Sequence, residues 1–78
     1  MKSEIEFGVL YRTPNGWRFS VRERPTAMAC GRLHEVAAEV DSDLALRAFE
    51  AHLRTHWTVE GTAHWQQTDS DWWQVRFE

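Results

Sequence analysis

The chain has 78 residues, of which 42% are hydrophobic and 27% charged, and its formal net charge is −3 at pH 7. These values are typical of one small folded domain and too apolar for a disordered chain, so we predict a single domain over residues 1–78. The longest run without a charged side chain, residues 61–68, is too short to span a bilayer, and the acidic N-terminus lacks the apolar stretch of a signal peptide.

The cysteine content points to a reducing compartment. Cys30 is the one cysteine in the sequence, which excludes an internal disulfide and favours a cytoplasmic location. The net negative charge argues against a simple binder of polyanions. We expect neither a membrane segment nor a cofactor.

The first predicted element is a β-hairpin. Ile5, Phe7, Val9 and Tyr11 alternate with polar residues, and a second alternating run begins at Trp17 and continues through Phe19 and Val21. A three-residue loop over residues 14–16 places Tyr11 opposite Phe19 and keeps one face apolar, with proline and glycine at turn positions that suit them. We therefore predict that Phe7, Val9 and Tyr11 face the core.

The middle of the chain contains one clear helix. Pro25 and Gly31 are breakers, and residues 25–40 fit a helix and a strand equally well; we expect extended structure there. Apolar residues then recur at three- and four-residue spacing, which predicts a helix over about residues 42–56. They are Leu46, Phe49, Leu53 and Trp57. The side chain of Asp41 or Ser42 is expected to cap its N-terminus.

A second hairpin is predicted after the helix. Ala63 and Trp65 share one face of a strand, Trp73, Val75 and Phe77 share a face of the next, and residues 68–71 form the turn. The fold class is α+β: a single small domain with an antiparallel sheet of two β-hairpins, room for a further short strand, and one helix packed on the sheet, in the order ββ(β)αββ. The predicted core is Phe7, Val9, Tyr11, Phe19, Val21, Leu46, Phe49, Leu53, Trp65, Trp73 and Val75.

Two segments carry a likeness to a known family. The runs Gly16-Trp17-Arg18-Phe19-Ser20-Val21 and Val40-Asp41-Ser42-Asp43-Leu44-Ala45-Leu46 are similar to the hairpin-then-helix layout of antitoxins with a partial ribonuclease-H-like fold. The resemblance covers about half of the chain and contains no diagnostic motif. The tryptophan-rich second hairpin departs from it, and no functional residue is carried over.

The leading functional interpretation is a small non-enzymatic protein-binding module, such as an inhibitor or accessory subunit of the kind carried by phages or mobile elements. One flank of the predicted helix lacks charge, which is unusual for a helix surface in water, and we predict that it binds a protein partner and mediates a homodimer. The predicted partner-binding residues are Leu44, Ala48, Ala51, His52 and Thr55, with Trp57 and Trp72 as aromatic anchors. Charges on the first and last strands are expected to discourage pairing at open sheet edges.

The alternative is a protein that binds single-stranded nucleic acid. Arginines and an exposed aromatic residue on an open sheet are the groups that such proteins use, the arginines for phosphates and the aromatic ring for bases. The candidate residues are Arg12, Arg18, Arg22, Arg24, Trp72 and Arg76.

A second alternative is a small zinc- or thiol-dependent enzyme. Cys30 and His34 are four residues apart, as are His52 and His56, and His64 follows nearby. Structural zinc sites usually contain pairs of cysteines, and no residue pattern marks Cys30 as activated. We therefore predict no metal site and no catalytic residue.

Overall fold

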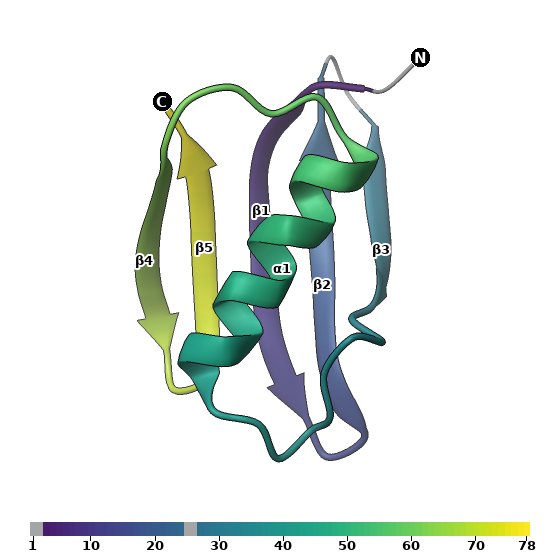
Figure 1. Cartoon of the computed structure of the whole chain (residues 1–78), viewed down its shortest axis with the longest axis vertical. Helices are drawn as coiled ribbons and strands as arrows, with labels where there is room; N and C mark the ends of the chain where they lie inside the picture. Colours follow the sequence, from purple (N-terminus) through teal and green to yellow (C-terminus); the bar gives the residue numbers. More distant parts are fainter. Residues whose placement is uncertain (1–2, 25–26) are drawn as a thin grey trace.

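The computed structural model describes residues 3–24 and 27–78 and confirms the α+β fold class. Five strands and one helix follow the order β1 (Ile5–Thr13), β2 (Gly16–Glu23), β3 (Met28–Arg32), α1 (Ser42–His56), β4 (Ala63–Asp69) and β5 (Trp72–Phe77). The strands form one antiparallel sheet in the order β3-β2-β1-β5-β4. Helix α1 lies diagonally across one face of this sheet (Figure 1).

The register of the first hairpin differs from the prediction. Thr13 pairs with Gly16, so the loop is the two residues Pro14 and Asn15, and Tyr11 lies opposite Arg18. The hydroxyl of Thr13 closes this turn: it donates to the carbonyl of Gly16 at 2.8 Å and accepts the amide of Asn15 at 3.3 Å. A shift of one residue moves every side chain of a strand to the other face. The prediction that Phe7, Val9 and Tyr11 face the core is therefore wrong.

The core lies between the sheet and α1. Gly8 and Leu10 supply the inner face of β1, and Phe49 of α1 lies directly above Gly8. The predicted core residues Phe19, Val21, Phe49, Leu53 and Val75 are buried, whereas Leu46, Trp65 and Trp73 are half-buried against them. The buried hydrophobic residues are Leu10, Trp17, Phe19, Val21, Leu33, Ala45, Phe49, Leu53, Trp57 and Val75.

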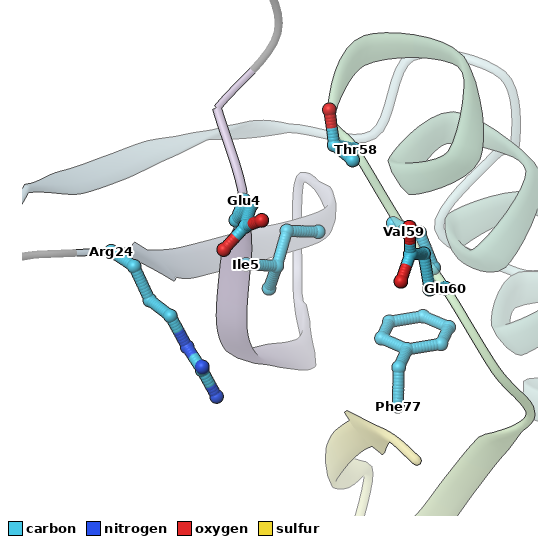
Figure 2. Close-up of a pocket in the computed structure, with 7 residues that line it drawn as sticks. All are labelled: Glu4, Ile5, Arg24, Thr58, Val59, Glu60 and Phe77. Carbon is cyan, nitrogen blue, oxygen red and sulfur yellow. The ribbon is translucent and has the colours of Figure 1, made fainter.

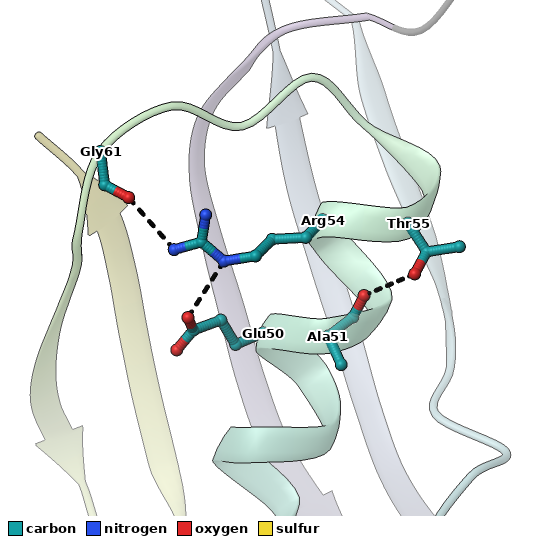
Figure 3. Close-up of polar contacts among 5 residues, drawn as sticks. All are labelled: Glu50, Ala51, Arg54, Thr55 and Gly61. Carbon is teal, nitrogen blue, oxygen red and sulfur yellow. Dashed lines mark hydrogen bonds and ion pairs between the residues drawn. The ribbon is translucent and has the colours of Figure 1, made fainter.

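Helix α1 begins and ends where the sequence predicts. Asp41 is the N-cap residue, but its side chain makes no capping hydrogen bond; its carbonyl accepts the amide of Ala45 instead, so the predicted side-chain cap is wrong. At the other end Arg54 donates to the carboxylate of Glu50 and to the carbonyl of Gly61, both at 3.1 Å (Figure 3). These contacts hold the last turn of α1 against the segment that enters β4.

The segment before α1 contains the further short strand. β3 pairs with β2, and Gly31 lies inside β3, so this glycine does not interrupt the strand. A Cβ atom at position 31 would lie 3.1 Å from Cζ of Phe19, and this close approach of the ring favours a glycine there. Pro25, the other predicted breaker, lies outside the described residues.

A side-chain hydrogen bond joins the end of α1 to β2. The indole Nε1 of Trp57 donates to Oε1 of Glu23 at 2.6 Å, and the Trp57 side chain is buried. Replacing Trp57 by phenylalanine keeps most of the apolar contact but removes the donor, leaving a partly buried carboxylate without this partner. We expect Trp57→Phe to lower the free energy of unfolding by about 1.5 kcal/mol.

Urea denaturation monitored by circular dichroism measures this loss. The matched control is the double variant Trp57→Phe/Glu23→Leu, in which neither polar partner remains. It should recover part of the lost stability, because two apolar groups leave no buried charge unpaired. A double variant that is less stable by the full sum of the two single losses would contradict the pairing.

Candidate functional site

The face of the sheet opposite α1 is uncovered. Alternate residues of all five strands point to this side, and none of them is buried. We call this surface the open face. It consists of Phe7, Val9 and Tyr11 of β1, Arg18, Ser20 and Arg22 of β2, Met28, Cys30 and Arg32 of β3, His64 and Gln66 of β4, and Trp72, Gln74 and Arg76 of β5.

Two aromatic rings stack on the open face. Tyr11 and Trp72 are cross-strand neighbours, their ring centroids lie 4.4 Å apart, and the angle between their planes is 11°. Trp72 is 42% exposed, although it is a large hydrophobic residue. In a parallel pair each ring turns one of its π faces away from the other, so a further planar group can extend the stack.

Four arginines share the open face with these rings. Arg18 and Arg32 are direct cross-strand neighbours, and Arg22 and Arg76 lie farther along the same face. Glu6 forms an ion pair with Arg22 at 3.1 Å, while the guanidinium of Arg76 lies 5.6 Å from the ring centre of Phe7. Like charges directly opposite each other destabilise a sheet unless an anion lies between them. The Arg18–Arg32 pair is therefore suited to hold an anionic group.

The arginine pair and the aromatic stack belong to one line of neighbours across four strands. We call this line the cross-strand row. It consists of Arg32, Arg18, Tyr11 and Trp72, in that order. Adjacent strands lie about 4.8 Å apart, so the row extends over about 14 Å, with cations at one end and stacked rings at the other.

Half of the twelve acidic residues lie in one part of the chain, away from the open face. Residues 33–60, which form α1 and its flanking loops, contain six acidic residues and two arginines. Figure 1 shows that this part of the chain lies across the helix-covered side of the sheet. The net charge of −3 therefore arises mainly away from the open face, and it does not describe the charge that a ligand would meet there.

Two of the predicted nucleic-acid residues are not on the open face. Arg12 points to the helix side, where Nη2 donates to the carbonyl of Val40 at 2.9 Å and the guanidinium lies 4.6 Å from the ring centre of Trp17. Its Nε lies 3.8 Å from a carboxylate oxygen of Asp71. Arg12 therefore connects the loop before α1 to the sheet, and it does not share the open face with the other predicted arginines.

Arg24 lies beyond the end of β2. It lines a hollow of about 270 Å³ at the end of the sheet, together with Glu4, Ile5, Thr58, Val59, Glu60 and Phe77 (Figure 2). Glu4 and Glu60 make this hollow more acidic than basic. We therefore exclude Arg24 from the candidate site, whereas Arg18, Arg22, Trp72 and Arg76 lie on the open face as the sequence predicted.

The predicted protein-binding flank of α1 forms a separate surface. Leu44 is 52% exposed, and a shallow hollow of about 340 Å³ is lined by Glu35, Ala48, Ala51, His52, Thr55 and His56. The hydroxyl of Thr55 donates to the carbonyl of Ala51 at 2.8 Å (Figure 3), and Nδ1 of His52 lies 3.4 Å from a carboxylate oxygen of Glu35. The Thr55 hydroxyl and the His52 ring, which are polar groups of this flank, thus already have partners within the same chain.

Neither predicted aromatic anchor serves this flank. Trp57 is only 9% exposed and packs into the core against Phe19. Trp72 lies on the open face, on the opposite side of the sheet from α1. We therefore remove both tryptophans from the flank.

The residues suggested for zinc or thiol chemistry are dispersed. Cys30 lies on the open face with Ser20 as its hydrogen-bonding neighbour at 3.5 Å, whereas the rings of His52 and His56 lie 4.5 Å apart on α1. His64 faces Arg76 on β4 and β5, and His34 lies exposed in the loop after β3. Within residues 3–24 and 27–78, no group of three or more histidine, cysteine, aspartate or glutamate side chains could hold a metal ion.

Fold and surface together define a small α+β domain with a helix-covered face and an open, arginine-bearing face. Comparison of the chain with protein-family models, with curated proteins and with solved structures found no match. The resemblance to antitoxins therefore remains a prediction. In the part of the chain that is described, no helix combines the length and the apolar character needed to cross a membrane.

Proposed function

We propose that this protein is a small non-enzymatic module that binds single-stranded nucleic acid on the open face of its sheet. The cross-strand row is the observation that supports this proposal, because it places a pair of arginines beside two stacked aromatic rings, of which Trp72 is exposed. Single-stranded nucleic acid offers both of the matching groups, a phosphate backbone and planar bases.

The two ends of the cross-strand row bind different parts of the nucleic acid. Arg18 and Arg32 bind phosphate oxygens, which removes the repulsion between their guanidinium groups. A base stacks on the free face of Trp72, an interaction that contributes about 1–3 kcal/mol per base. Arg22 and Arg76 extend the cationic surface along the strand direction. Binding of this kind depends on charge and stacking, so we expect little preference for base sequence.

The protein-binding and regulatory role is the second candidate. The exposure of Leu44 and the hollow beside Ala48 and Ala51 favour it, because both mark an apolar surface on α1. This flank offers a partner few hydrogen-bonding groups, whereas the open face offers four guanidinium groups. We therefore rank the protein-binding role second. The exposed free thiol of Cys30 supports the cytoplasm as the place where the protein acts.

Binding of mixed-sequence single-stranded oligonucleotides tests the proposed function. We expect the wild-type protein to bind at low salt, and Trp72→Ala to weaken binding by about five- to a hundredfold, because a stacking platform is lost. The double variant Arg18→Gln/Arg32→Gln should reduce the slope of log affinity against log salt by about 1.4, since two phosphate contacts disappear. Fluorescence anisotropy of labelled oligonucleotides at several salt concentrations measures both effects.

The matched control is Arg47→Gln, which removes an exposed arginine from α1 on the other side of the sheet. It should leave affinity and salt slope unchanged. The proposal fails if the wild-type protein shows no salt-dependent binding, or if Arg47→Gln reduces the slope by about 0.7, the change expected for each arginine of the double variant Arg18→Gln/Arg32→Gln.

A further inference from the structure

The sheet has two edges, and β4 forms one of them. Charges on the first and last strands were expected to protect the edges, but β1 lies at the centre of the sheet and β5 lies beside it. Figure 1 shows β4 and β3 on the two outer sides. The charges of Glu6 and Arg76 therefore protect no edge. The strands whose outer edges could pair with another strand are β3 and β4.

Most of β4, from Ala63 to Gln67, lacks the usual features that block pairing at an edge. Native edge strands carry lysines, prolines or bulges, or are very short. β3 has five residues and carries Arg32, whereas β4 has seven residues, and its first charged group is Asp69 at its end. The uncharged run 61–68 covers nearly the whole strand. The one irregularity of β4 lies between Gln67 and Asp69, beyond most of this run.

The hydrogen bonds at the start of β4 show which backbone groups face outward. Thr62 and Glu78 exchange two hydrogen bonds, the amide of each donating to the carbonyl of the other at 3.0 and 3.2 Å. In an antiparallel ladder, residues alternate between groups that point to one neighbouring strand and groups that point away from it. The amides and carbonyls of Ala63, Trp65 and Gln67 therefore point to the free edge.

We infer that this edge pairs with the β4 edge of a second copy of the chain, antiparallel, about a twofold axis at Trp65. This register uses all the outward-pointing groups of Ala63, Trp65 and Gln67, since Ala63 of each copy meets Gln67 of the other. It opposes no like charges, because Asp69 then lies opposite Gly61 and Glu60 opposite Ser70. The strand is thus complementary to itself in both hydrogen bonding and charge.

Side chains on the two faces fit the same register. Trp65 is half-buried, and its ring lies 6.3 Å from that of Phe49 on the helix side of the sheet. The two Trp65 side chains become direct neighbours there and continue the core across the interface. On the other side Gln66 of each copy meets His64 of its counterpart. The axis is normal to the sheet, so both helices lie on one side and both open faces form one surface.

Sedimentation or light scattering of the protein without nucleic acid tests this inference separately from the proposed function. We expect a dimer whose population grows from micromolar to millimolar concentration. Gln67→Pro removes an outward amide while the β4–β5 ladder keeps its hydrogen bonds, and it should weaken the dimer by about ten- to a hundredfold. Gln67→Ala keeps this amide and is its matched control, which should remain dimeric.

A second variant keeps the test decisive if Gln67→Pro prevents the chain from folding. His64→Lys/Gln66→Lys alters only exposed side chains but opposes two pairs of lysines across the twofold axis, and it should give folded monomer. Ala48→Arg, on the flank of α1, should leave the dimer intact. A wild-type protein that is monomeric at every concentration overturns the inference. So does a dimer that both β4 variants leave intact and Ala48→Arg dissociates.

Discussion

Replacing Phe49 by alanine is expected to lower the free energy of unfolding by about 3–5 kcal/mol, which is close to the whole stability of a domain of this size. Phe49 is fully buried at the centre of the core. Its ring contacts the inner surface of β1 at Gly8 and lies within 6.3 Å of the rings of Phe19 and Trp65. Truncation leaves a cavity under α1 that these large rings cannot close.

Chemical denaturation followed by circular dichroism gives this loss directly. Arg47→Ala, two residues earlier and exposed on α1, is the control and should change the stability by less than about 0.5 kcal/mol. A cooperative unfolding transition for Phe49→Ala that barely shifts would contradict the orientation of the helix on the sheet.

Replacing Gly8 by valine is expected to lower the free energy of unfolding by about 3 kcal/mol, at the upper end of the usual range for overpacking. A Cβ atom there would lie 3.2 Å from Cζ of Phe49 and 3.2 Å from Cγ1 of Val75, before the two methyl groups of valine are added. Both neighbours are fully buried and cannot move aside easily. The loss arises from displacing α1 from the sheet, because β-branched residues otherwise suit strands.

A double-mutant cycle isolates this clash. Phe49→Leu makes room above β1, so Gly8→Val should be less destabilising in the Phe49→Leu background than in the wild-type protein. Additive losses in this cycle would show that Gly8 is needed for a reason other than the contact with Phe49.

The helix could be predicted because its apolar residues repeat with one period and lie against one surface. The first strand could not, because both of its faces carry large apolar residues. Its outer face holds Phe7, Val9 and Tyr11, while the inner face includes Gly8 and Arg12, which look unlike core positions in the sequence. Register then depended on turn length alone, and the hydroxyl of Thr13, which closes a two-residue turn, gave no clear signal in the sequence.

The residues of the candidate site could also be predicted only in part. Alternation along β2 correctly placed Arg18 and Arg22 on one face, and Trp72 and Arg76 followed from alternation along β5. Arg32 was missed because its position depends on the pairing of β3 with β2, between residues distant from each other in the chain. Tyr11 was missed because the predicted register of the first hairpin placed its side chain in the core. Local periodicity identifies the face of a strand, but only strand pairing assembles a row across the sheet.

The order of the strands also determines how the chain can fold. The last strand in the sequence, β5, inserts between the first strand and β4, so Gly8 near one end of the chain pairs with Val75 near the other. Such distant pairings require closure of a long loop before they contribute stability, which slows folding. A chain emerging from the ribosome can form the β1–β3 meander early, but it cannot join the two halves of the sheet until β5 has been synthesised. Until then the edge of β1 that β5 will occupy stays open to any other strand.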